Sequence, residues 1–251
     1  MLPTEKSKPE TSLSKYSILL YGQEKIGKTS FASNFPKPIF LLFEPGAKDL
    51  EIYKEDIKDW NHFRRILKDL EVDKSFQNVI FDTADVAYNM IERYVCEANG
   101  VSDPNDMEYG KGWRKIRQEI TQSLTRLLKT GKGVLFTSHS TEKEFKRRDG
   151  ASTDRIVPTM SKQMREILEP IVDIWCYYRY TKTGGREFVI RGNEELAAGH
   201  RLENHFLGIK TIPGGSSSKE AYNNFLQGFN NNMNSIEKDK PLLFKIKRGG
   251  K

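Results

Sequence analysis

A glycine-rich segment near the start of the chain has the residue types needed to hold phosphate groups. Residues 22–29 read Gly-Gln-Glu-Lys-Ile-Gly-Lys-Thr, a complete G-x-x-x-x-G-K-[ST] motif. Its glycines let the backbone turn successive N–H groups toward phosphate oxygens. In such a loop Lys28 reaches the β- and γ-phosphates, and the Thr29 hydroxyl ligates Mg²⁺. We therefore expect ATP and Mg²⁺ as cofactors, bound by Gly22, Gln23, Glu24, Lys25, Ile26, Gly27, Lys28, Thr29 and Ser30.

The segments on either side of this motif favour the same interpretation over a chance glycine-rich turn. Residues 16–21 form an apolar, strand-like run directly before the loop. Residues 30–35 can form a short helix, which Pro36 and Pro38 would end. The N-terminal end of that helix carries a partial positive charge and would add to the binding of an anion.

Three polar residues stand at the ends of predicted strands, where they could act on a bound nucleotide. Asp82 would hold Mg²⁺ together with Thr29. Glu44 could polarise the attacking water. His139 could contact the γ-phosphate and report its loss to the following loop. Each residue also has a simpler reading: an N-cap for Asp82, a solvated turn residue for Glu44 and a structural role for His139.

Strand-like and helical patterns alternate along the chain and predict the framework that positions these residues. The expected strands cover residues 16–21, 38–43, 78–82, 134–138, 171–180 and 187–191. The expected helices cover residues 30–35, 60–70, 84–98, 113–128 and 219–229. Continuous apolar strands between helices are typical of an α/β fold with a mainly parallel central sheet flanked by helices. The last two strands, joined by Lys182-Thr183-Gly184-Gly185, predict a C-terminal β-hairpin.

Composition sets further bounds on the chain. It has 251 residues, is 37% hydrophobic and carries a formal net charge of +7, which weakly favours a polyanionic partner. No apolar run reaches membrane-spanning length and no signal peptide is visible. Cys96 and Cys176 are isolated, which fits a reduced, cytoplasmic location. We expect a disordered N-terminal tail (1–13), an ATPase core (14–213) and a flexible C-terminal tail (214–251).

Several short motifs together resemble a known family. They are the early phosphate loop, Phe43-Glu44-Pro45-Gly46, Val79-Ile80-Phe81-Asp82-Thr83, Tyr109-Gly110-Lys111-Gly112-Trp113 and Thr137-Ser138-His139. Over about residues 16–213 the chain resembles the phage-type AAA ATP-binding proteins with a RecA-like core, a group that includes the Sak-type single-strand annealing recombinases. The resemblance implies a RecA-like P-loop NTPase fold. It also implies that Glu44 is the catalytic glutamate, Asp82 the Mg²⁺ aspartate and His139 the sensor. The first helix is much shorter than in RecA itself.

The resemblance also implies a single-stranded DNA partner and a ring or filament of identical subunits. The loop after His139 would face the DNA, with Phe145 stacking on a base and Lys146, Arg147 and Arg148 neutralising phosphates. An exposed, charged turn is the alternative. Lys111 and Arg114 form a second candidate DNA contact, although the neighbouring Trp113 could simply be core.

Arginines on or beside the hairpin are candidates for completing a neighbouring subunit's ATP site. They are Arg179, Arg186 and Arg191, and the sequence does not choose among them. Each could equally be a surface charge.

The resemblance leads us to expect an ATPase that binds single-stranded DNA in phage recombination or annealing, with hydrolysis stimulated by DNA. A single-strand DNA-binding protein is a possible further partner, and no membrane association is expected. Two alternatives stay open from the residues alone. One is a P-loop kinase for a small substrate, with the Lys146–Arg148 run as its lid. The other is a nucleotide-gated assembly module with negligible turnover, against which the Glu44 carboxylate argues.

Overall fold

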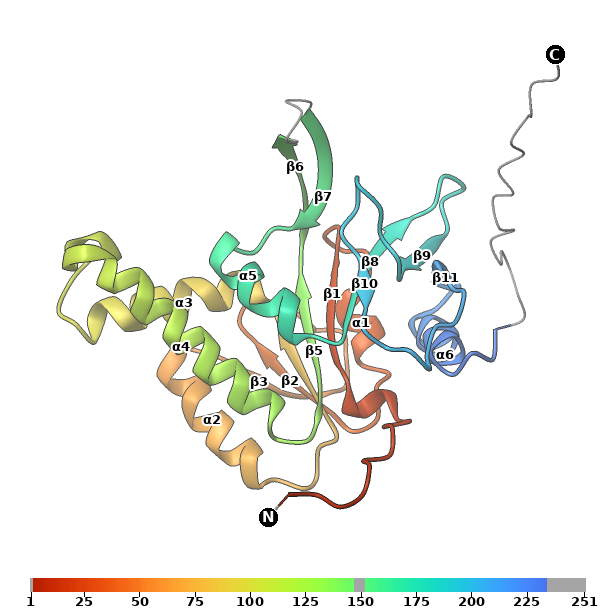
Figure 1. The fold of residues 1–251 in the computed structure, drawn as a ribbon, viewed down its shortest axis with the longest axis horizontal. Helices are drawn as coiled ribbons and strands as arrows, with labels where there is room; N and C mark the ends of the chain where they lie inside the picture. The colour runs from red at the N-terminus through yellow and green to blue at the C-terminus, as the bar shows by residue number, and fades with distance from the viewer. Residues whose placement is uncertain (1, 147–151, 234–251) are drawn as a thin grey trace.

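The computed structural model describes residues 2–146 and 152–233 (Figure 1). Its helices are α1 (Lys28–Ala32), α2 (Trp60–Val72), α3 (Ala84–Glu97), α4 (Lys111–Leu128), α5 (Lys162–Ile171) and α6 (Ser218–Phe229). Its strands are β1 (Ser17–Gly22), β2 (Pro38–Leu42), β3 (Tyr53–Asp56), β4 (Asn78–Asp82), β5 (Gly133–Ser138), β6 (Ser140–Lys146), β7 (Ser152–Pro158), β8 (Ile174–Tyr180), β9 (Arg186–Val189), β10 (Gly199–His200) and β11 (Thr211–Pro213). Every predicted helix and strand lies within a few residues of an observed one.

The central sheet confirms the predicted α/β architecture. Among the described residues its strand order is β11-β9-β8-β1-β5-β4-β2-β3, with β10 paired to β8. The pairs from β8 through to β3 are parallel, and β9, β10 and β11 pair antiparallel. The β8–β9 pair is the predicted hairpin. Strand β5 lies between β1, which leads into the phosphate loop, and β4, which ends in Asp82. The carboxyl ends of these parallel strands share one edge of the sheet, where ligands of such folds bind.

Two helical layers cover the sheet because its strands are apolar on both faces (Figure 1). Leu19 of β1 packs into the core made with α2, α3, α4 and α5. Its neighbours Ile18 and Leu20 point to the opposite face, into the core made with α1 and α6. Side chains alternate across a strand, so a continuous apolar run feeds both cores at once.

Helix α6 corrects the expected C-terminal tail. The sequence predicts this helix but places it in a flexible tail that begins at residue 214. Ala221, Phe225 and Phe229 are fully buried, and Phe225 makes edge contacts with Phe31 and Phe206. Burial of large aromatic side chains stabilises a fold strongly. Residues 218–229 therefore belong to the core, and so does Leu13 at the other boundary of the predicted tails.

A two-stranded ribbon stands where a loop was expected after His139. Strands β6 and β7 pair antiparallel and project from the carboxyl edge of the central sheet (Figure 1). The sequence did not reveal these strands because polar and charged residues occupy most of their positions, which leaves no alternation of apolar and polar residues. Phe145 lies on this ribbon, whereas Arg147 and Arg148 lie outside the described residues.

No helix among the described residues combines the length and the apolar character required to cross a bilayer.

Candidate functional site

The phosphate loop connects β1 to α1 by a tight turn that depends on its glycines. A Cβ at Gly22 would lie 2.2 Å from the carbonyl oxygen of Tyr178 on the neighbouring strand β8, so no side chain fits there. Gly27 has φ +104°, a conformation that other residues rarely adopt. Helix α1 begins directly after it, at Lys28. The geometry matches the predicted phosphate loop.

The side chain of Lys28 crosses the inside of the phosphate loop, from the start of α1 back to the end of β1. Its Nζ donates to the carbonyl oxygens of Gly22 and Gln23, each at 2.9 Å. The side chain is buried, and this desolvation lowers the pKa of Lys28, while the nearby carboxylates of Asp82 and Asp85 oppose the shift. Those acids therefore help to keep a cation at the position where phosphate charge would lie.

Thr29 and Asp82 meet as the sequence predicted. The Thr29 hydroxyl donates to Oδ2 of Asp82 at 2.8 Å, and Thr137 of β5 donates to the other carboxylate oxygen. A hydroxyl and a carboxylate are the hard oxygen ligands that Mg²⁺ prefers. No group of three or more His, Cys, Asp or Glu residues that could hold a metal occurs in the described part of the chain. A two-oxygen site suits Mg²⁺ that takes its other ligands from phosphates and water.

Glu44 and His139 face each other beside the loop. Nε2 of His139 lies 3.6 Å from Oε1 of Glu44, and Nδ1 lies 3.5 Å from Nζ of Lys28. Desolvation raises the pKa of Glu44, the charge of His139 opposes this, and the charge of Asp82 adds to it.

These side chains line one cavity of about 550 Å³. Its wall is formed by Glu24, Lys25, Gly27, Lys28, Thr29, Ser30, Glu44, Pro45, Asp82, Thr83 and His139. Four separate elements, the phosphate loop and the ends of β2, β4 and β5, supply this wall. The structure thus brings together the predicted cation, the Mg²⁺ ligands, the candidate base and the candidate sensor.

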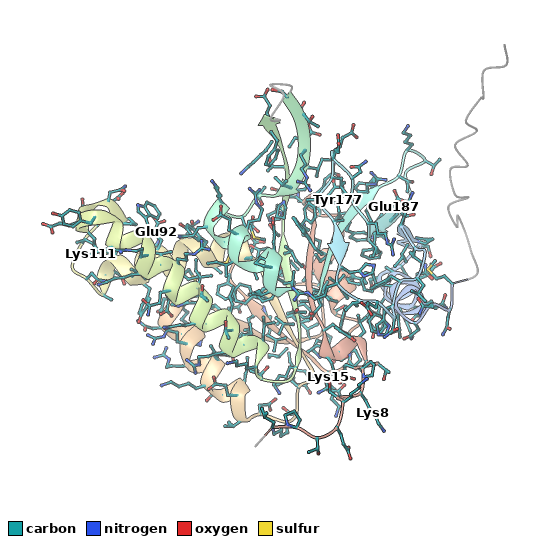
Figure 2. All side chains as sticks on the ribbon, viewed as in Figure 1. Lys8, Lys15, Glu92, Lys111, Tyr177 and Glu187 are labelled. Carbon is teal, nitrogen blue, oxygen red and sulfur yellow. The ribbon has the colours of Figure 1, made fainter. Side chains whose placement is uncertain are left out.

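Other predicted residues lie elsewhere. Lys111 and Arg114 begin α4, at the end of the helical layer far from the hairpin that carries Glu187 (Figure 2). Trp113 beside them packs against the core and donates to Asn105.

The three hairpin arginines have different surroundings. Arg179 pairs with Glu187 across the hairpin, at 2.8 Å. Arg191 is exposed and lies two residues after Val189, the last residue of β9. Arg186 instead donates to the carbonyl of Ile26 in its own phosphate loop, at 3.3 Å. Whether Arg179 or Arg191 reaches a neighbouring subunit stays a prediction.

Sequence reasoning missed two residues next to the site. Tyr21, directly before the loop, is fully buried and donates to the carbonyl of Ala197 at 2.6 Å. Asp85 accepts from Ser138 and Thr159, joining the start of α3 to the end of β5 and the residue after β7. Their positions, one residue before the motif and three after Asp82, were visible in the sequence. Their partners were not, since these come from distant segments.

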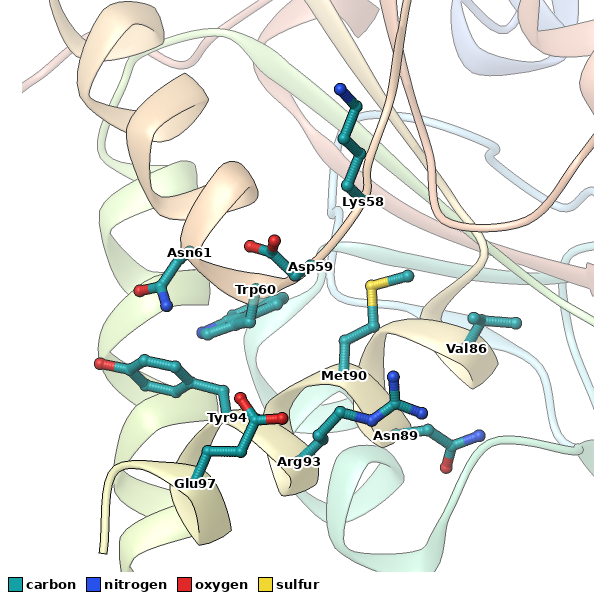
Figure 3. A pocket seen from close by; sticks show the side chains of 10 residues that line it. All are labelled: Lys58, Asp59, Trp60, Asn61, Val86, Asn89, Met90, Arg93, Tyr94 and Glu97. Atoms are coloured by element: carbon teal, nitrogen blue, oxygen red, sulfur yellow. The ribbon is translucent and has the colours of Figure 1, made fainter. Parts of the chain in front are cut away.

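A second cavity of about 440 Å³ lies between α2 and α3, apart from the phosphate loop (Figure 3). Its lining combines Lys58 and Arg93 with Asp59 and Glu97. Asp59 caps α2 by accepting from the amide of His62, and Trp60 donates to Glu119 of α4. The first contact stabilises the start of α2, and the second joins α2 to α4.

Comparison with known proteins gives two individual matches. The chain is 26% identical over 199 residues to the SPbeta prophage-derived uncharacterized protein YorG of Bacillus subtilis (strain 168), which covers 75% of this chain and 57% of that protein. The chain thus spans little more than half the length of this curated relative. Among solved structures, the KaiC-like protein PH0186 of Pyrococcus horikoshii OT3 matches with 18% identity and a TM-score of 0.48, over 82% of this chain and 88% of that one.

The family comparison covers most of the chain. The AAA domain family AAA_24 matches residues 14–202, which include every element from β1 to β10. The matched region contains the phosphate loop, Glu44, Asp82 and His139. The strand order, with β5 between β1 and β4, is that of a RecA-like P-loop NTPase. The chain therefore belongs to the AAA_24 family of AAA domains and has the fold of a RecA-like P-loop NTPase.

Proposed function

We propose that this protein is a Mg²⁺-dependent ATPase of phage type that binds single-stranded DNA during recombination or annealing. The observation that carries the hydrolytic part is the placement of Glu44 and His139 beside the Lys28 ammonium, in the cavity that the phosphate loop lines. The AAA_24 family and the prophage origin of the relative support the part of the proposal that describes an ATPase of phage type. DNA, recombination and a homo-oligomeric state are inferences beyond these observations.

In the proposed reaction each residue has one task. The loop amides and Lys28 hold the phosphates, and Thr29 with Asp82 would hold Mg²⁺, which supplies charge neutralisation of the phosphate oxygens. Glu44 orients a water toward the γ-phosphate and accepts its proton. The raised pKa of Glu44 makes its carboxylate a better proton acceptor than an exposed one.

His139 provides a route from the nucleotide to the ribbon. Its side chain contacts Lys28, and its carbonyl accepts from the amide of Thr159, which follows β7, at 3.0 Å. Strand β6 begins at the next residue, so His139 and Thr159 close the base of the ribbon. A change in the position of His139 would therefore move both strands.

Tyr21 supplies a second connection between the site and the ribbon. Its hydroxyl lies 3.3 Å from the carbonyl of Ile156 in β7, while its backbone leads directly into the phosphate loop. Two connections make the ribbon the element best placed to respond to ATP.

The DNA-binding part of the proposal places single-stranded DNA at the far end of this ribbon. Phe145 is 37% exposed there, so its ring is accessible for stacking on a base. The basic residues Lys146, Arg147 and Arg148 follow Phe145 in the sequence. Together they form a basic, aromatic-bearing segment joined to the nucleotide site through His139.

The test is the ATPase rate with and without single-stranded DNA, for wild type and for the triple variant Lys146→Ala/Arg147→Ala/Arg148→Ala. We expect DNA to stimulate the wild type. The triple variant should keep ATP binding and lose DNA affinity, with the slope of log affinity against log salt reduced by about 0.7 for each lost phosphate contact. Hydrolysis that DNA does not affect, in a protein without DNA affinity, would refute the DNA-binding part. Transfer of the γ-phosphate to an added small molecule would favour the kinase alternative.

A further inference from the structure

One carboxylate holds the backbone on both sides of His139. Asp85, in the first turn of α3, accepts a hydrogen bond at Oδ1 from the hydroxyl of Thr159, the residue that follows β7. The same oxygen accepts from the hydroxyl of Ser138 at 3.1 Å, and Ser138 directly precedes His139. The amide of Thr159 in turn donates to the carbonyl of His139 at 3.0 Å. These contacts close a ring that runs through Asp85, Thr159, His139 and Ser138.

Thr159 is the firmer of the two partners of Asp85. The Ser138 hydroxyl also lies 3.2 Å from the carbonyl oxygen of His139, and its single proton serves one acceptor at a time. Thr159 donates to His139 with its amide and to Asp85 with its hydroxyl, so its two contacts do not compete. A hydrogen bond to a carboxylate is also stronger than one between neutral groups. The contact between Asp85 and Thr159 therefore contributes most to the ring.

The place of Asp85 in its helix does not explain these contacts. An acid in the first turn stabilises a helix through the helix dipole, and this effect needs no partner outside the helix. Asp85 instead directs Oδ1 at hydroxyls that lie 53 and 74 positions away in the sequence. Its other oxygen, Oδ2, is buried and has no hydrogen-bond partner in the described part of the chain. The side-chain contacts of Asp85 thus go to the segments beside His139.

The ring determines the position of a side chain that faces the candidate base. Nε2 of His139 lies 3.6 Å from Oε1 of Glu44, and Nδ1 lies 3.5 Å from Nζ of Lys28. Both distances depend on where the backbone of His139 is held. A misplacement of about 1 Å near reacting groups can lower a rate by about a hundredfold.

Asp85 contributes charge to the site as well as position. Burial raises the pKa of Glu44, His139 lowers it, and the charges of Asp82 and Asp85 add to the rise. Burial lowers the pKa of Lys28, and the same two acids oppose that shift. The two contributions are separable, because an asparagine side chain would keep the accepting oxygen and lose the charge.

We infer that Asp85 is a positioning residue of the proposed ATPase. By holding Thr159 and Ser138, it fixes His139 beside Glu44 and ties the base of the ribbon to the same point. Asp85 is not among the residues that line the nucleotide cavity, so it acts through its neighbours. The activity measurements below rest on the proposed hydrolysis, whereas the ring of hydrogen bonds does not.

Paired substitutions of Thr159 test the inference. Thr159→Val keeps the shape of the side chain and loses the hydroxyl, whereas Thr159→Ser keeps the hydroxyl. With ATP and Mg²⁺, Thr159→Val should lower kcat by about tenfold or more and leave ATP affinity unchanged. Thr159→Ser should stay close to wild type. Thr121→Val is the matched control, since that hydroxyl donates to the carbonyl of Arg117 within α4.

Substitutions of Asp85 separate position from charge. Asp85→Asn can still accept from both hydroxyls, so its kcat should fall less than that of Asp85→Ala. The lost negative charge lowers the pKa of Glu44, so the acid limb of kcat should move to lower pH in Asp85→Asn. In Thr159→Val the charge stays but His139 is less well placed, so the limb should move to higher pH. A general loss of stability would not move the two limbs in opposite directions.

Hydrogen exchange measures the ring without hydrolysis. With Mg²⁺ and a non-hydrolysable ATP analogue, peptides that contain His139 or Thr159 should exchange faster in Thr159→Val and Asp85→Ala than in wild type. Exchange in β2 and β4 should not change. If wild type does not hydrolyse ATP, the proposed function fails and this measurement alone decides the inference. Equal exchange of these peptides in wild type and Thr159→Val would overturn it, and so would equal kcat for Thr159→Val and Thr159→Ser.

Discussion

Nε2 of His139 lies 3.6 Å from Oε1 of Glu44, so the histidine influences the protonation of the candidate catalytic base. Burial raises the pKa of Glu44, and the charge and hydrogen bonding of His139 lower it. Hydrolysis needs the ionised carboxylate. Activity should therefore be lost as the pH falls through a pKa above the ordinary glutamate value of about 4.3.

Replacing His139 by Gln should move this acid limb to higher pH. The variant removes an influence that lowers the pKa of Glu44, while the burial that raises it stays. The measurement is kcat against pH for both proteins, with ATP saturating. An acid limb that stays in place or moves to lower pH would show that His139 does not act on Glu44.

Lys28→Ala should weaken ATP binding with little effect on folding. Lys28 contacts backbone carbonyls of its own loop rather than the cores, so its loss removes charge rather than packing. A hydrogen bond to a charged group contributes about 1.5–3 kcal/mol, which corresponds to roughly 10- to 100-fold in affinity. Nucleotide titration and circular dichroism check both parts, with Lys68→Ala on the exposed side of α2 as control. An unchanged ATP affinity in the folded variant would contradict the phosphate-loop assignment.

Glu44→Gln should bind ATP normally and lose turnover. The amide has nearly the same shape but cannot accept the proton of the attacking water, and general-base catalysis contributes about 10²–10⁴-fold. Steady-state hydrolysis and ATP titration separate the two effects, and Glu51→Gln is the control because Glu51 is exposed away from the site. If turnover of the variant stayed within a few-fold of wild type, Glu44 would be a solvated turn residue and not the catalytic base.

Arg186→Ala should weaken nucleotide binding within the same chain. Arg186 donates to Ile26, and its guanidinium lies 3.1 Å from where a Cβ on Gly27 would be, so it supports the loop from behind. We expect a several-fold loss of affinity, while Arg179→Ala, which breaks only the pair with Glu187, should change little. Mixing Arg186→Ala with Lys28→Ala should not restore hydrolysis. Restoration would mean that Arg186 acts on a neighbouring subunit instead.

Phe225→Ala should destabilise the whole domain. Phe225 of α6 is fully buried among Phe31, Phe188 and Phe206, and truncating a buried phenylalanine costs about 3–5 kcal/mol. Denaturant unfolding measures the loss, and Gln227→Ala on the exposed side of the same helix should leave the free energy of unfolding almost unchanged. If Phe225→Ala were as stable as wild type, residues 218–229 would be part of a tail and not of the folded core.

The sequence alone determined the phosphate loop, the parallel α/β fold and the strand-end positions of Glu44, Asp82 and His139. These followed because a glycine-rich loop has a fixed chemistry, and because a strand buried on both faces is recognisable as a short apolar run. Parallel strands end at one edge, so residues at different strand ends had to converge there.

Tertiary structure decided what depends on pairing between distant segments. The charged β6–β7 ribbon has no apolar alternation, so only its register showed that Lys143 faces Arg155 and Glu144 faces Asp154. The contact of Arg186 with Ile26 joins residues 160 positions apart, and that distance hid its role within the chain. Helix α6 follows a Gly/Ser-rich stretch typical of a tail, and only its packing against α1 and the central sheet made it part of the core. Local residue patterns record the periodicity of an element, whereas the partner that buries or pairs it is set by the fold as a whole.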